Sequence, residues 1–230
     1  MKIAVVSGNV TNMSMSLINN LVEDKHTVII VSDTFDEVVS EHVWIGSSKV
    51  HVINECASLV TSWYYLAAKV AIVCKSLDLF PKVDLLVHIT GEIEDDSIWT
   101  EEGIDSLNTQ RNLLALFFAI ENLTTYLENS EFARIINVYP NLGNTPTTLD
   151  AFSKMSMDVV TRNFEHELGK SNLYINGLSY DADNPSAEHF TRAINRIYKD
   201  YSNSGILFEL DSDGWVLPSP DQHVEVQING

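Results

Sequence analysis

The sequence predicts a single α/β domain with a doubly wound parallel sheet of about seven strands and helices on both faces. Apolar segments of strand length alternate with longer segments of helical period along nearly the whole chain. Each parallel strand needs a long crossover connection, which the intervening helices supply. A length of 230 residues with 45% hydrophobic residues suits one large core, and no repeat marks a second domain.

Each expected element has a local reason in its residue pattern. The expected strands are short apolar runs at residues 2–6, 26–31, 50–53, 83–87, 133–138, 173–178 and 206–210. The expected helices lie between them at residues 14–22, 58–77, 103–128, 147–168 and 187–201. We expect residues 1–216 to form the domain, and residues 217–230, with two prolines, to form an extended tail that packs against a neighbouring subunit.

Charge and composition exclude several classes of function. A formal net charge of -18 repels nucleic-acid phosphates and anionic membrane surfaces, so neither is an expected partner. No secretory signal pattern begins the sequence, and Lys69 interrupts its longest apolar stretch, so we expect a cytoplasmic protein. Cys56 and Cys74 are expected to be reduced and without a chemical role.

The informative residues follow the expected strands, because ligands of open α/β sheets bind beyond the carboxyl ends of the strands. Residues 7–14 (SGNVTNMS) follow the first strand, and residues 88–91 (HITG) follow the fourth. Residues 139–143 follow the fifth strand and precede a helix that carries Asp150 and Lys154.

In this order and spacing, these segments resemble the short-chain dehydrogenase/reductase family over residues 1–215. Residues 7–14 resemble the family's Thr-Gly-x-x-x-Gly-x-Gly loop, and residues 88–91 its Asn-Asn-Ala-Gly. Ser153 and Lys154 resemble the end of Tyr-x-x-Ser-Lys, Asn112 is placed like the family's catalytic asparagine, and residues 209–214 (ELDSDG) are similar to a late Val-Asp-Gly-Gly. The resemblance implies a Rossmann-like fold, a nicotinamide cofactor and oxidoreductase chemistry.

The cofactor loop departs from that pattern. It keeps Gly8 but carries Asn12 and Ser14 at the other two glycine positions, where side chains intrude on the pyrophosphate and on helix–strand packing. Asn12 can still adopt a left-handed backbone and donate to a phosphate, so a modified binding mode with Gly91 nearby stays open. Asp33 favours NAD over NADP, unless Ser32 and Asp33 only form a solvated turn.

The catalytic pattern departs as well. The family's tyrosine position is Asp150, and its serine position falls on Tyr139 or Pro140. An aspartate is ionised at pH 7 and cannot replace a phenol as proton donor, so we expect ordinary ketone reduction to be lost.

The replacements suggest a site for proton transfer instead. Asp150 and Lys154 are four residues apart on one helix and can pair, with His88 and Tyr139 approaching from neighbouring strand ends. Such a group supports dehydration, isomerisation or cyclisation. The alternative is structural: an ordinary helix ion pair, a strand-end histidine and a packed tyrosine.

Three functions therefore remain open. The first is a small-molecule enzyme in which NAD is optional. The second is a catalytically inactive binding or assembly subunit whose crevice is filled by Asn12, Met13 and Tyr139. The third is an NAD-dependent dehydrogenase with Tyr139 as a relocated proton donor.

Two further patterns concern surfaces rather than chemistry. The helices beginning near Gly103 and Thr147 resemble those with which the family forms dimers and tetramers, so we expect a homo-oligomer or a hetero-oligomer with a related subunit. The aromatic run of residues 63–65 is expected in the core or in a subunit contact, and the acidic run of residues 92–96 is expected to be solvated rather than to bind a metal.

Overall fold

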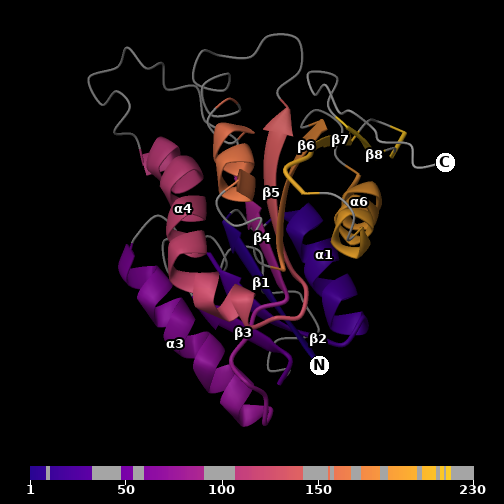
Figure 1. Ribbon diagram of the computed structural model, residues 1–230. Helices are drawn as coiled ribbons and strands as arrows, with labels where there is room; N and C mark the ends of the chain where they lie inside the picture. Colours follow the sequence, from indigo (N-terminus) through magenta and orange to yellow (C-terminus); the bar gives the residue numbers. More distant parts are fainter. Residues whose placement is uncertain are drawn as a thin grey trace, which may run out of the picture.

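A sheet runs through the middle of the molecule and is covered by helices on both faces (Figure 1). The structure, a computed structural model, describes residues 1–8, 11–32, 48–53, 60–90, 107–141, 155, 158–166, 172–181, 186–200, 204–210, 213–214 and 216–218.

The strands are β1 (Lys2–Gly8), β2 (His26–Val31), β3 (Val50–Ile53), β4 (Leu85–Ile89), β5 (Ala133–Asn141), β6 (Leu173–Asp181), β7 (Leu207–Leu210) and β8 (Val216–Pro218). The helices are α1 (Asn12–Glu23), α3 (Val60–Ser76), α4 (Leu107–Glu128) and α6 (Ala187–Lys199), and residues 158–166 are also helical. The strand order is β3-β2-β1-β4-β5-β6-β7-β8. All neighbours pair in parallel except β7 and β8, so the predicted doubly wound parallel sheet is confirmed.

Two groups of boundaries differ from the sequence-based prediction. β4 ends at Ile89 and β5 at Asn141, so His88 and Tyr139 lie inside strands and not in the loops after them. In a sequence, polar residues after an apolar run suggest that the strand has ended. Here the backbone pairing continues past both residues. Residues 217 and 218, which we assigned to the tail, pair with β7 as part of β8.

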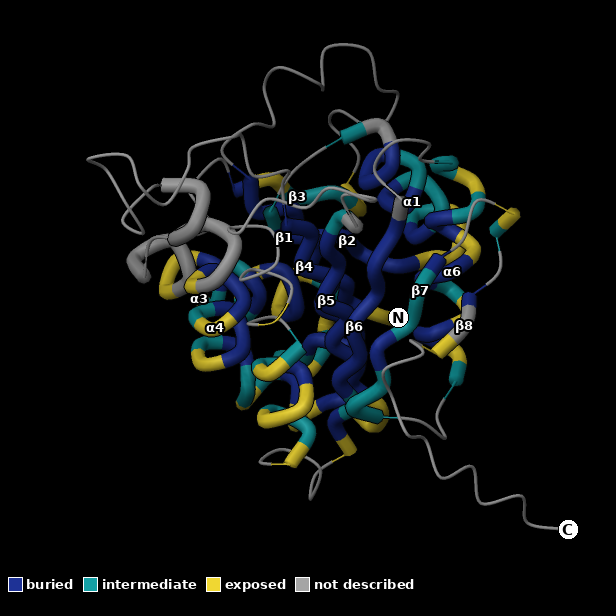
Figure 2. Tube along the Cα trace, turned by 90° about the horizontal axis from the view of Figure 1, so that it is seen from above, coloured by how far each residue is buried: buried dark blue, intermediate teal, exposed yellow. Residues whose placement is uncertain are grey.

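Alternation along the strands divides the apolar residues into two cores, one on each side of the sheet. The core under α1 and α6 contains Val6, Val87 and Ile136. The core under α3 and α4 contains the residues that alternate with them along the strands, such as Val5 and Ile135. In Figure 2 the strands are buried along most of their length, and most exposed residues lie on outer helix surfaces and chain turns. The sequence pattern therefore sets which strand residues face each helical layer.

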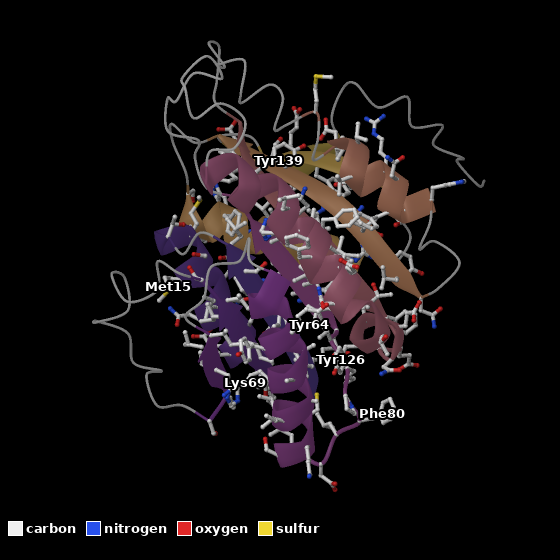
Figure 3. The ribbon with its side chains drawn as sticks, turned by 90° about the vertical axis from the view of Figure 1, so that its left-hand side faces the viewer. Met15, Tyr64, Lys69, Phe80, Tyr126 and Tyr139 are labelled. Atoms are coloured by element: carbon white, nitrogen blue, oxygen red, sulfur yellow. The ribbon has the colours of Figure 1, made fainter. Side chains whose placement is uncertain are left out.

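Some side chains outside these cores were also assigned from sequence. Cys74 is buried as a free thiol, as expected, and Cys56 lies outside the described residues. Tyr64 and Tyr65 are 65% and 64% exposed, so they do not belong to the core, and the alternative of a subunit contact stays a prediction. Figure 3 labels Tyr64 on α3. Both tyrosines lie on α3, whose opposite side supplies Leu66 and Val70 to the core.

The described parts of the chain contain no helix that is both long enough and apolar enough to cross a membrane. Among those same residues, no cluster of three or more histidine, cysteine or acidic side chains is arranged to hold a metal ion. The acidic run of residues 92–96 lies outside them.

A buried carboxylate joins β1 and β4 at their amino ends. Asp84 accepts hydrogen bonds from the backbone N–H of Ile3 at 2.7 Å, from the Ser130 hydroxyl at 2.6 Å and from Lys82 Nζ at 2.9 Å. Hydrogen bonds to a charged group are stronger than neutral ones, so this contact fixes the two central strands relative to each other.

At the other end of the same strands, the backbones meet at Gly8. This residue has a φ of 97°, which residues other than glycine rarely adopt. A Cβ atom there would also overlap the carbonyl group of Ile89. Glycine is therefore required by the packing of β1 against β4.

We expect Gly8→Ala to lower the free energy of unfolding by about 3 kcal/mol or more, since it combines left-handed strain with a backbone clash. Gly205→Ala is the matched control, because Gly205 also has a positive φ of 71°, but its added Cβ would meet the side chain of Glu165, which can move. The control should lose only about 1–2 kcal/mol. Chemical denaturation measures both, and equal losses would show that the contact with Ile89 does not constrain the strands.

Candidate functional site

Polar side chains form two rows across the sheet face that α3 and α4 cover. In the first row, Ser7, His88, Asn137 and Gly177 are aligned in register on β1, β4, β5 and β6. In the second row, Tyr139, Ser179 and Glu209 are aligned on β5, β6 and β7, two residues closer to the carboxyl edge. The period of two along each strand places both rows on one face.

The first row is closed to solvent. Ser7, His88 and Asn137 are all buried, and the Ser7 hydroxyl is 2.9 Å from His88 Nδ1. His88 was predicted to approach Tyr139 from a neighbouring strand end. It does lie on the strand beside Tyr139 and on the same face, but its register neighbour is Asn137, so His88 and Tyr139 belong to different rows.

Tyr139 begins the second row, on β5. Its phenol donates a hydrogen bond to Asp158 Oδ1 at 2.9 Å, so the helical residues 158–166 are joined to β5. Figure 3 places Tyr139 at the end of the sheet towards which the strands run. Burial raises the pKa of Tyr139 far above its usual value, and the negative charges of Asp158 and Glu209 raise it further, while a hydrogen bond with Ser179 opposes them. The phenol is therefore a neutral donor.

Sequence reasoning missed Asp158, Ser179 and Glu209. One signal for Asp158 was present, because it follows Lys154 by four residues and so belongs to the same predicted helix face as Asp150 and Lys154. No local signal identifies Ser179 and Glu209, whose place beside Tyr139 depends on strand register.

Several predicted site residues are not described. Asp150, Lys154, Asp33 and Gly91 lie outside the described residues. Asn112 lies in α4 and Asn12 in α1, and the structure describes only their backbone. The Asp150–Lys154 pair therefore stays a prediction.

In the described part of the predicted cofactor loop, the side chain of Ser14 forms hydrogen bonds with the backbone of Thr11. The Ser14 hydroxyl accepts a hydrogen bond from the backbone N–H of Thr11 at 2.6 Å and donates to the Thr11 carbonyl at 2.9 Å. Met13, which we considered as a residue filling the crevice, packs instead in the core under α1 and α6.

These contacts bear on whether a dinucleotide fits. Backbone N–H groups at the start of a helix are the usual donors to a pyrophosphate. Here Ser14 already uses the N–H of Thr11, the residue that precedes α1, and Gly8 is explained by strand packing alone. The described loop residues therefore fit a dinucleotide poorly, and we route no chemical step through one.

Comparison with known structures places this fold beside one family. A short-chain dehydrogenase from Mycobacterium avium matches with a TM-score of 0.77 and 15% identity over 96% of this chain and 85% of that one. An NADPH-dependent reductase involved in bacilysin biosynthesis, YwfH, matches with a TM-score of 0.72 and 18% identity over 91% of this chain and 98% of that one.

A short-chain dehydrogenase/reductase from Brucella ovis matches with a TM-score of 0.71 and 15% identity over 92% of this chain and all of that one (100%). The sequence itself matches no protein-family model and no curated protein. At these identities the likeness concerns the fold.

The neutrality of Tyr139 has a measurable consequence at high pH. Its folded pKa is raised, so the unfolded phenol loses its proton first, and Tyr139 should destabilise the fold progressively as the pH rises above about 10. Absorbance at 295 nm reports the ionisation of tyrosine as the pH rises. We expect Tyr139→Phe to show the same change in this absorbance as the unmodified protein until the protein unfolds.

Tyr64→Phe is the control for the loss of a phenol, because Tyr64 is exposed to water and not buried against the sheet. A phenol that ionises below pH 10 and disappears in Tyr139→Phe would contradict the assignment and would restore Tyr139 as a conventional acid.

Proposed function

The fold is that of the short-chain dehydrogenases/reductases, and on this scaffold we propose a small-molecule enzyme that transfers protons without transferring hydride. The hydrogen bond between Tyr139 and Asp158 at the carboxyl edge of the sheet is the observation that carries this proposal. It joins a base and a neutral donor where ligands of such sheets bind. Ser179 and Glu209 extend the same polar row.

In this proposal Asp158 is the base. Its carboxylate is partly exposed, and its oxygens have lone pairs enough to hold the Tyr139 phenol and still accept a proton from a substrate carbon next to a carbonyl group. The proton then returns at another position, which is isomerisation, or combines with a departing hydroxide, which is dehydration. Tyr139 orients the carboxylate and, because its pKa is raised, keeps its own proton.

The remaining predicted residues have supporting roles in the same proposal. Asp150 and Lys154 precede Asp158 at four-residue spacing in the helix that the sequence predicts for residues 147–168, and such a helix would bring all three to one face. We propose that Lys154 binds the negative charge that develops on the substrate oxygen. Asn112 stays a predicted site residue, and we propose that His88, hydrogen-bonded to Ser7, orders β4 beside the strand of Tyr139.

Solvent deuterium tests the reaction class without knowledge of the substrate. A proton-transfer enzyme incubated in D₂O with pooled small ketones and hydroxy acids, and with no nicotinamide cofactor, should add deuterium to its substrate, which mass spectrometry detects. We expect Asp158→Asn, Asp150→Asn and Lys154→Ala to slow this incorporation by about a hundredfold to ten-thousandfold, as expected for loss of a positioned acid or base.

Tyr64→Phe, on the exposed face of α3, should retain full incorporation. Incorporation that requires added NADH would favour the dehydrogenase alternative. Incorporation that is equal in all four variants would remove these residues from the mechanism.

We propose further that this chain binds NAD weakly, because Ser14 takes the place of a phosphate on the Thr11 N–H. Ser14→Gly frees that donor and should strengthen NADH binding about tenfold to a hundredfold, the value of one hydrogen bond to a charged group. Calorimetric titration with NADH and NADPH at millimolar concentration measures the change, and NADH should be preferred if Asp33 faces the ribose.

Ser16→Ala, two residues further along α1, is the control and should leave the affinity unchanged. Tight NADH binding by the unmodified protein would show that Ser14 does not compete with the cofactor.

A second candidate function is an inactive assembly subunit, and one observation favours it. Apolar side chains stay exposed on two helices in contact: Leu114 and Phe117 on α4, and Val159, which is 54% exposed, on the helix of residues 158–166. The ring centroids of Phe117 and Phe164 are 5.6 Å apart, so these helices form one surface. We propose that a second copy or a related subunit covers it.

Val159→Glu should weaken that association at least tenfold in Kd, because it places a charge in an apolar contact. Sedimentation velocity measures the effect, and Ile72→Glu on α3, which is also exposed, is the control. Equal effects of both substitutions would place the contact elsewhere, and an intact oligomer without deuterium incorporation would favour the assembly function.

A further inference from the structure

Two buried polar side chains lie near Gly177, one on the sheet and one on the helical residues 158–166. Asn137 on β5 and Thr161 on the helix are both 0% exposed. Within the described part of the chain, neither the two amide atoms of Asn137 nor Thr161 Oγ1 has a hydrogen-bond partner. Buried polar groups in folded proteins are nearly always paired, with protein or with water, because leaving them unpaired is costly.

Both side chains lie near Gly177 on β6. Gly177 is the register neighbour of Asn137 on the adjacent strand, so a side chain at either position would project to the same face. Thr161 Oγ1 lies 3.8 Å from the point where a Cβ atom of Gly177 would stand. Asn137 and Thr161 therefore approach the same glycine, one from the neighbouring strand and the other from the helix above.

The space at this glycine is small. The same Cβ position is 3.6 Å from Tyr139 Cε1 and only 2.6 Å from Leu207 Cδ2, so side chains bound it on two sides. A Cβ atom would already overlap Leu207 there, so the glycine position itself has no room for a further group, and whatever joins Asn137 to Thr161 lies beside it and is of atomic size. Water fits both the size and the chemistry, since a buried water makes about three hydrogen bonds and can donate to one group while it accepts from another.

We propose that Asn137 and Thr161 hold a buried water molecule that joins β5 to the helical residues 158–166. The amide of Asn137 offers both a donor and an acceptor, and the Thr161 hydroxyl takes either role. Two hydrogen bonds through the water let the groups act together without direct contact.

The water site also positions the Tyr139–Asp158 pair. Asp158 and Thr161 are three residues apart and lie on one helix face, so a contact that fixes Thr161 over Gly177 also fixes Asp158 beside the Tyr139 phenol. Asn137 and Thr161 are thus positioning residues. This inference rests on the hydrogen bond and the burial of these residues, and it holds whichever reaction the site catalyses.

A double-mutant cycle with Asn137→Leu and Thr161→Val tests the water. If a water joins the two groups, each single change leaves the other group poorly paired and should raise the unfolding equilibrium constant, roughly tenfold. The double variant should then be more stable than the sum of the two single effects predicts. If no water is present, each change removes an unpaired buried group, so both should stabilise the protein and add independently, which would overturn the proposal.

Thr191→Val is the matched control, because Thr191 is a buried threonine whose hydroxyl already donates to Ser16 Oγ at 3.1 Å. Its effect should add to that of Asn137→Leu without coupling. Should Asn137→Leu fail to fold, water-selective NMR on the unmodified protein decides: the side-chain amide of Asn137 should show a cross-peak to a long-lived water. Absence of that cross-peak would reject the site, independently of the deuterium experiment.

Discussion

The close backbone contact between Gly8 and Ile89 is the constraint on which the carboxyl edge of the sheet depends. It holds β1 and β4 in the register that pairs Ser7 with His88, and β5 and β6 continue that register to Asn137 and Gly177. A slip of one residue on any strand would turn its polar side chains towards the opposite core and place apolar ones in the row. The polar rows can therefore exist only because the central strands approach this closely.

The residues of the two polar rows are at positions where apolar side chains would be buried at a lower cost in free energy. The Ser7 hydroxyl pairs with His88 Nδ1, and the Tyr139 phenol pairs with Asp158 from a different layer of the fold. The polar groups thus form two pairs, one between β1 and β4 and the other between β5 and the helical residues 158–166. Ordered polar groups gathered at the edge of an α/β sheet are typical of a site that acts on a ligand, since a purely structural interior gains little from them.

The sequence predicted the fold well because strand and helix periods are local. The seven parallel strands were found, the short antiparallel β8 was missed, and the other errors lay at strand ends, where His88 and Tyr139 looked like loop residues because they are polar. The site was harder to predict, since Asp158, Ser179 and Asn137 gain their neighbours only through register and helix packing. Ser14 was expected to intrude on the cofactor loop. In the structure, the Ser14 hydroxyl accepts a hydrogen bond from the backbone N–H of Thr11.

Gly8, which the loop keeps, and Ser14, which stands at the position of a glycine, have separate causes, and this changes what they imply. Gly8 is required by the contact with Ile89, so its presence is no argument for a bound dinucleotide. Ser14 satisfies a backbone donor at the start of α1 that a phosphate would otherwise use. A strand contact and a helix-end hydrogen bond thus explain the described loop residues without a cofactor. The function must accordingly be argued from the opposite side of the crevice, where Tyr139 and Asp158 join the sheet to the helix.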